Sequence, residues 1–204
     1  MNKPSANTVL LSTGVAASAV LLQPSVAAAH LVTTGMGPVY DGIGHLLLTP
    51  EDLVPAMAVA MYAGLRGKEP GRLALFFFPL AWLIGGFAGL LAHYSPTYPL
   101  SVLSFLLLGA LIAADLRMPA SVFTLLVVAV GIMHGFFNGI AMNGGPGSSG
   151  LLGIAATLFV LIAIASAVVV SLRATWTRVA VRVAGSWIAA VGLLMLGWLA
   201  KGNV

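Results

Sequence analysis

The chemistry open to this chain depends on four histidines and five acidic residues among its 204 amino acids. His134 lies inside a long apolar run, and Asn138 follows four residues later, which places both on one face of a helix. An ionisable residue inside an apolar run is costly unless it pairs or faces a cavity, so it is a candidate for function. Because imidazole commonly binds nickel, cobalt, copper and zinc, His134 and Asn138 predict a metal-binding position.

Three glycines, Gly131, Gly135 and Gly139, occupy the same helix face at four-residue spacing. A stripe of small residues lets another helix approach closely, and His134 and Asn138 would then bond across that interface. Helix packing is therefore the alternative to metal binding for this face, although one face can serve both purposes. The stripe is also a candidate surface for a membrane-protein partner or a second copy of the chain.

A second pair of candidate ligands, Asp41 and His45, lies before the first long apolar run. On a helix the four-residue spacing makes a two-ligand face, whereas in a glycine-rich turn it makes either a ligand pair or an Asx-type turn. Gly42 and Gly44 favour an irregular or re-entrant start, which is tolerated only where it is buried or lines a polar cavity.

Two further histidines and one acidic segment have weaker claims to metal binding. His30 would chelate a metal through its amino group and ring if it became the mature amino terminus; otherwise it only marks a cleavage site. His93 is either a ligand or an interfacial histidine beside two tyrosines. Segment 49–52, Thr-Pro-Glu-Asp, predicts a helix start in which the acids complement the helix dipole, and direct ligation is the less favoured alternative.

The composition determines which elements position these residues. The chain is 60% hydrophobic and 7% charged, whereas a soluble domain carries about 25% charged residues. Its apolar runs are continuous over about 20 residues, as in membrane helices, whereas barrel strands alternate. We therefore predict an all-α fold, a polytopic transmembrane helical bundle. The absence of cysteine excludes disulfides and thiolate metal sites.

Six membrane spans follow a predicted signal peptide in the sequence. Lys3, the apolar stretch 9–22 and small residues at 25–29 predict cleavage after Ala29; an uncleaved first span is the alternative. Residues 30–204 then form a single transmembrane domain. The spans are predicted at 53–65, 73–93, 100–114, 120–142, 151–172 and 179–200.

Basic residues give the bundle an orientation. Seven of the 9 lie in the loops after the first, third and fifth predicted spans: Arg66, Lys68, Arg72, Arg117, Arg173, Arg178 and Arg182. The loops after the second and fourth spans carry no charge, so the basic side is predicted to be cytoplasmic. We thus expect a bacterial inner-membrane protein whose mature amino and carboxyl termini are both periplasmic. The net charge of +4 is a topology signal, and no nucleic-acid binding is expected.

Two motifs resemble those of the HupE/UreJ family, which are small membrane proteins of hydrogenase and urease gene clusters regarded as nickel or cobalt permeases. They are Gly-x-x-His-Leu-Leu at residues 42–47 and His-Gly-x-x-x-Gly at residues 134–139. The chain departs from the family pattern at Pro38 and Val39, which replace His-Pro, and at Gly44, which replaces Asp. In the fourth span Asn138 replaces a second His and Ala141 replaces Glu, as in a divergent branch close to the second subgroup of the family.

The resemblance implies a permease for a divalent transition metal, nickel or cobalt, that captures the ion with His45 and Asp41, with His30 as a further ligand. The ion would pass toward His134 and Asn138, and Asp115 is the evident candidate at the cytoplasmic exit. The alternatives are a non-transporting accessory subunit that assists assembly of a metalloenzyme, and a haem-binding subunit. No nucleotide-binding motif and no array of nucleophile and base are present, so no enzyme is expected.

Overall fold

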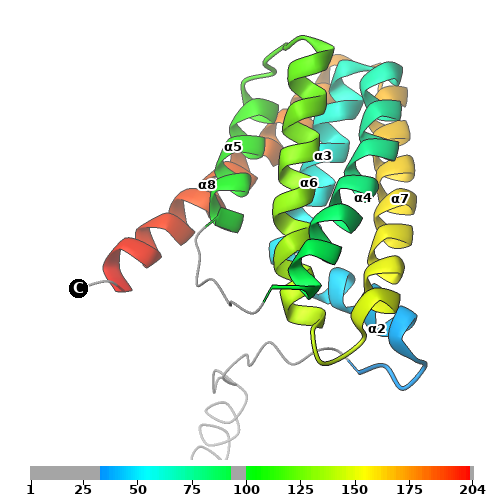
Figure 1. Ribbon diagram of the computed structural model, residues 1–204. Coiled ribbons are helices and arrows are strands. Elements are labelled where there is room, and N and C mark those ends of the chain that lie inside the picture. The colour runs from blue at the N-terminus through cyan, green and yellow to red at the C-terminus, as the bar shows by residue number, and fades with distance from the viewer. Residues whose placement is uncertain (1–32, 93–99, 203–204) are drawn as a thin grey trace, which may run out of the picture. The chain divides into compact units, whose positions relative to one another are not determined.

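The computed structural model describes residues 33–92 and 100–202, and in these ranges every regular element is a helix (Figure 1). The predicted cleavage site, with His30, and His93 lie outside the described residues. The seven helices are α2 (Pro38–Leu48), α3 (Pro50–Arg66), α4 (Lys68–Leu90), α5 (Leu100–Ala113), α6 (Ala120–Met142), α7 (Gly147–Ser171) and α8 (Thr175–Gly202).

Four of these helices, α4, α6, α7 and α8, are long and apolar enough to cross a membrane. Helices α2 and α3 together pass the same test as one broken span, and α5 is a shorter apolar helix of 14 residues. The prediction of an all-α bundle of apolar helices is therefore confirmed, with four to five segments of spanning length.

The predicted irregular start of the first span is a helix, and the irregularity lies at its end. Residues 38–48 are helical, and α2 meets α3 at an angle of 77°. Thr49, between them, has an extended backbone with ψ of 95°. The residue before a proline is disfavoured in the helical region, so Pro50 ends one helix and begins the next.

Helices α3, α4, α6 and α7 run side by side, and α5 and α8 pair next to them (Figure 1). The closest approach is between α4 and α6, where glycines let the two backbones touch. A Cβ at Gly135 would overlap the carbonyl oxygen of Trp82, and one at Gly139 would overlap that of Gly86. On α4, a Cβ at Gly85 would likewise overlap the carbonyl oxygen of Ile132.

The glycine stripe is therefore a packing surface within the chain. Gly131, Gly135 and Gly139 are buried against α4, which already occupies the face proposed for a partner or a second copy. The four-residue spacing of the glycines predicted that another helix packs closely here. It could not determine whether that helix belongs to the same chain.

Arginine side chains join α8 and the α5–α6 connection to the ends of other helices. Arg178 donates to the carbonyl oxygen of Leu65 (3.1 Å), and Arg182 donates to that of Ala113 (3.1 Å). Arg66 donates to the carbonyl oxygen of Asp115 (3.3 Å) and forms an ion pair with its carboxylate. The last carbonyls of a helix have no intrahelical donor, so Arg178 caps α3 and Arg182 caps α5, while Arg66 holds the connection after α5.

Replacing Gly135 with alanine is expected to destabilise the protein, because the new methyl group must push α4 away from α6. Overpacking of this kind costs about 1–3 kcal/mol, which lowers the thermal unfolding midpoint by at least a few °C. Gly197→Ala is the matched control, because nothing lies within 4 Å of a Cβ at that position of α8. Equal unfolding midpoints for the two variants in the same detergent would contradict the assigned α4–α6 contact.

Candidate functional site

A buried carboxylate, Asp52, is the centre of the polar interior. It lies in the first turn of α3, directly after the 77° break, and only 7% of its surface is exposed. A carboxylate in an apolar interior is costly unless hydrogen bonds replace its hydration. The neighbours of Asp52 must therefore supply donors.

Helix α6 supplies two of these donors from the face that the sequence singled out. The Nδ1 atom of His134 lies 2.9 Å from Oδ1 of Asp52, and Nδ2 of Asn138 donates to Oδ2 over 2.8 Å. Both side chains are almost fully buried, with 1% and 3% of their surfaces exposed. Their four-residue spacing thus places two donors one turn apart against the two oxygens of one carboxylate.

The second ring nitrogen of His134 contacts α5. Nε2 lies 2.9 Å from the hydroxyl oxygen of Ser104, which is also 2.6 Å from the carbonyl oxygen of Ser101. A serine hydroxyl has one hydrogen, so two arrangements satisfy the geometry. If Ser104 donates to the imidazole, His134 is neutral; if Ser104 donates to Ser101, the ring donates from both nitrogens and is an imidazolium.

The indole of Trp82 stacks on this imidazole from α4. The ring centroids are 5.5 Å apart and the planes are inclined by 17°. The stack fixes the plane of the imidazole, so its two ring nitrogens point at Asp52 and Ser104. The imidazole of His134 on α6 is therefore contacted by one residue from each of α3, α4 and α5.

His45 approaches the same carboxylate from α2. Its Nε2 atom lies 3.9 Å from Oδ2 of Asp52, which is beyond hydrogen-bonding distance. His45 is more open than His134, with 12% of its side chain exposed. Among the described residues, no three His, Asp or Glu side chains are close enough together to hold a metal ion as they stand.

Asp41 does not join this cluster and binds Thr34 instead. Its carboxylate accepts hydrogen bonds from the backbone nitrogen (2.6 Å) and the hydroxyl (2.7 Å) of Thr34. Asp41 and His45 share α2, but the closest acidic contact recorded for His45 is Asp52. The structure thus brings together three of the residues predicted from the sequence, His45, His134 and Asn138, around an acid that the sequence analysis placed at a helix start.

Two atoms in this cluster have no partner. Oδ1 of Asn138 and Nε1 of Trp82 are buried without a hydrogen bond to any described residue. Unpaired buried polar atoms are rare in folded proteins and call for an explanation. Here they leave one free acceptor on Asn138, which contacts the carboxylate, and one free donor on Trp82, which stacks on His134.

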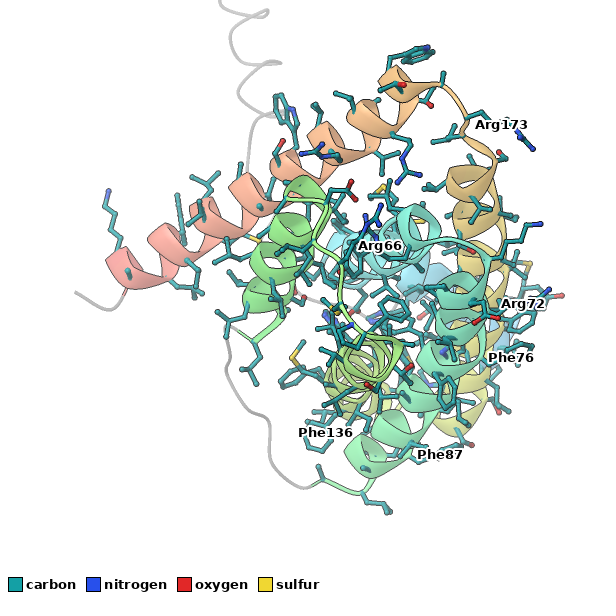
Figure 2. All side chains as sticks on the ribbon, turned by 90° about the horizontal axis from the view of Figure 1, so that it is seen from above. Arg66, Arg72, Phe76, Phe87, Phe136 and Arg173 are labelled. Atoms are coloured by element: carbon teal, nitrogen blue, oxygen red, sulfur yellow. The ribbon has the colours of Figure 1, made fainter. Side chains whose placement is uncertain are left out.

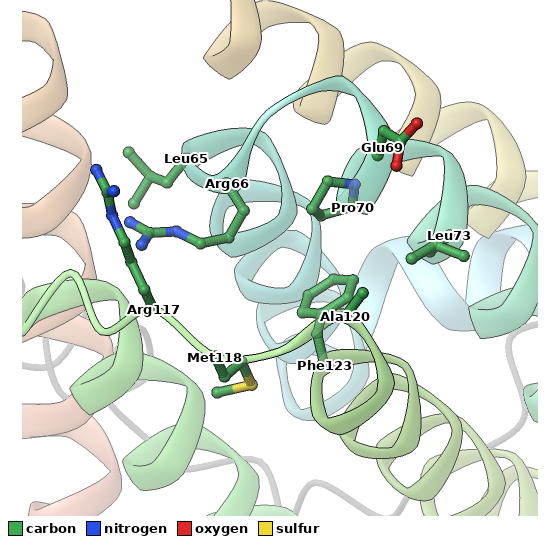
Figure 3. Close-up of a pocket in the computed structure, with 9 residues that line it drawn as sticks. All are labelled: Leu65, Arg66, Glu69, Pro70, Leu73, Arg117, Met118, Ala120 and Phe123. Carbon is green, nitrogen blue, oxygen red and sulfur yellow. The ribbon is translucent and has the colours of Figure 1, made fainter.

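The predicted exit residue, Asp115, lies at the opposite end of α3 in an arginine-rich surrounding. It pairs with Arg66, which together with Arg117 lines a cavity of about 410 Å³. Figure 3 shows these two guanidinium groups pointing toward one another and Glu69 lying on the far side of the cavity. A cation at this place meets arginines, and the carboxylate of Asp115 is already neutralised.

Fold and site together define a polytopic α-helical membrane protein with a His–Asp–Asn cluster buried in its helical bundle. The family model described as HupE / UreJ protein matches residues 18–195. The chain therefore belongs to the HupE/UreJ family, as its two motifs indicated. This family is associated with nickel or cobalt transport or with accessory functions, and it is not a catalytic family. No curated protein and no solved structure matches the chain.

Replacing Asp52 with alanine is expected to destabilise the protein, because His134 and Asn138 lose their shared acceptor while remaining buried. Removing one partner of a buried charged contact costs about 3 kcal/mol. Glu51→Ala is the matched control, since Glu51 is the exposed neighbour in the same first turn. The thermal unfolding midpoint in detergent measures the difference, and equal midpoints would show that Asp52 does not hold this cluster together.

Proposed function

We propose that this chain is an inner-membrane permease for a divalent transition metal, nickel or cobalt. Its six crossings are the broken α2–α3 pair, α4, α5, α6, α7 and α8, with a signal peptide removed after Ala29. The basic end of the bundle faces the cytoplasm, and both mature termini are periplasmic. The observation that carries the proposal is the convergence of His45, His134 and Asn138 on the buried carboxylate of Asp52.

The position of Asp52 along α3 supports entry from the periplasm. Arg66 ends α3 at the basic end of the bundle, and 14 residues separate the two side chains. At a rise of 1.5 Å per residue, Asp52 is about 20 Å from that end, which places it in the outer half of the membrane. Entry would be from the side on which α2 lies, where His45 is partly exposed.

The imidazole nitrogen of His45 and the carboxylate oxygen of Asp52 suit a metal ion that accepts both nitrogen and oxygen ligands. The gap of 3.9 Å between Nε2 of His45 and Oδ2 of Asp52 admits an ion bound to both, at roughly 2.0–2.2 Å from each. Oδ1 of Asn138 has no other partner and is available as a third ligand. Imidazole and oxygen ligands are compatible with nickel and cobalt, and also with copper and zinc.

Under this proposal the other candidate ligands act before the cluster. His30, His93 and Asp41 would collect the ion at the periplasmic face, and His45 would pass it to Asp52. His134 would hold the carboxylate of Asp52 in place through the contact between Nδ1 and Oδ1.

The second candidate function is that of a non-transporting accessory subunit that binds metal at the outer face. Two observations favour it. Asp52 is already hydrogen-bonded by His134 and Asn138, and Asp115 is neutralised by Arg66, so neither of these two acids is free to take an ion further inward.

Uptake of radiolabelled nickel and cobalt separates the two functions. Cells lacking their own importers would express the full chain or its Asp52→Asn, His45→Ala or His134→Ala variant at equal membrane abundance. A permease is expected to raise uptake, and each variant is expected to lose at least about tenfold of that gain, because each removes a ligand or its support.

Glu51→Gln is the control for this experiment, because it removes an exposed carboxylate next to Asp52 and is expected to transport normally. Asp41→Asn tests capture at the outer face separately from the cluster. If the inserted parent protein gives no uptake of either metal, the permease proposal fails. Metal binding by the purified protein, lost in the Asp52→Asn variant, would then support the accessory function.

A further inference from the structure

Six of the seven basic residues at one end of the bundle, all except Arg117 in the cavity beside Arg66, fall into two groups with different surroundings. Arg66, Arg178 and Arg182 are engaged with the ends of α3 and α5. Lys68, Arg72 and Arg173 are exposed, and none has a hydrogen bond or ion pair with another described residue. The two groups carry similar charge, but only the first has a structural partner.

The three unpaired cations surround one groove between α4 and α7. The groove has a volume of about 460 Å³, and Lys68 and Arg72 on α4 face Arg173 just beyond the end of α7. Figure 2 shows Arg72 and Arg173 on the same outer side of the bundle, at a distance from Arg66. No acidic residue lines the groove, and Ser166 and Ser171 add two hydroxyl groups.

Below the cations the groove is apolar and shallow. Its remaining lining consists of Gly71, Leu75, Ala163, Ala167 and Val170. Small side chains on both helices create this depression at the surface of the bundle.

An aromatic pair continues the apolar surface toward the middle of the membrane. Phe76 follows Arg72 by one helical turn, and its ring packs edge-on against Phe159 of α7, with centroids 5.9 Å apart. Phe76 and Phe159 are 61% and 41% exposed. In Figure 2 the Phe76 side chain lies close to Arg72 on the outer side of α4. A ligand with a charged head and a long apolar tail would therefore meet both kinds of surface in the correct order.

We propose that this groove between α4 and α7 binds an anionic phospholipid, with its phosphate held by Lys68, Arg72 and Arg173 and an acyl chain lying over Ala167 and the Phe76–Phe159 pair. Charge complementarity selects an anion. Three cations with no acid beside them attract an anionic headgroup more strongly than a zwitterionic one, whose own positive charge they repel. The apolar continuation selects a lipid over free phosphate, since phosphate would leave that surface unused. Basic pockets between membrane helices are a known way of holding such headgroups.

Native mass spectrometry of the purified full chain in detergent tests this proposal with phosphatidylglycerol and phosphatidylcholine as probes. The parent protein is expected to retain phosphatidylglycerol about tenfold better than phosphatidylcholine. The double variant Arg72→Gln/Arg173→Gln is expected to lose about tenfold of that binding, because each surface cation contributes appreciably to the attraction. No preference for phosphatidylglycerol in the parent would overturn the proposal.

The matched control is Arg117→Gln/Lys201→Gln, which removes the same charge at two exposed positions outside the groove. It is expected to bind phosphatidylglycerol like the parent. An equal loss of binding in both double variants would show that only the net charge of the protein matters, and it would overturn the proposal. Thermal unfolding midpoints equal to that of the parent would establish that each variant is folded.

Ala167→Phe separates a lipid site from a phosphate site. This exposed position lies in the apolar part of the groove, so the larger ring fills the seat of the acyl chain and leaves the three cations in place. We expect it to weaken phosphatidylglycerol binding. Unchanged lipid binding by this variant, together with displacement of the lipid by inorganic phosphate, would assign the groove to free phosphate and contradict the lipid proposal.

Discussion

The burial of one carboxylate constrains the whole interior of this protein. Asp52 is removed from water by the bend between α2 and α3, and its charge must be matched by donors from other helices. His134 and Asn138 supply these donors from α6, and Ser104 holds the far side of the imidazole from α5. Helices α5 and α6 make few other contacts with each other, so the Ser104–His134 contact is an important link between them.

The glycine contacts between α4 and α6 make this arrangement possible. Because Gly135 allows the α6 backbone to reach that of Trp82, the indole of Trp82 lies flat against the neighbouring His134 ring. A larger residue at position 135 would separate the two helices and the two rings together. Close packing and positioning of the polar cluster are therefore consequences of one interface.

The basic residues serve three purposes with one kind of side chain. Their distribution orients the bundle in the proposed topology, and Arg178 and Arg182 also cap helix ends, while Arg66 holds the connection between α5 and α6. The pairing of Arg66 with Asp115 places guanidinium groups around the acid that the sequence analysis predicted at the cytoplasmic exit. Three of the cations that cap no helix, Lys68, Arg72 and Arg173, surround the groove between α4 and α7, where they are free to meet an anion.

The sequence by itself determined the fold class, because a chain with 7% charged residues and long apolar runs can satisfy its backbone only as membrane helices. It also determined that His134 and Asn138 share a face with the glycines, since helical spacing is a local property. Its two motifs were sufficient to indicate the family. The start of α3 at Pro50 was indicated by segment 49–52, whereas α4 begins at Lys68, earlier than its apolar run suggests.

Only the tertiary structure decided what these faces contact. Pro50 and the two acids after it describe a helix start equally well at a surface or in an interior, so the sequence did not distinguish exposed Glu51 from buried Asp52. The distinction arises from helix packing, because Asp52 faces His134 and Asn138 on α6, whereas its neighbour Glu51 faces away and is exposed. Likewise, the contacts of Ser104 and Trp82 with His134 join residues from separate helices. No local pattern encodes such contacts, because they depend on how the helices pack.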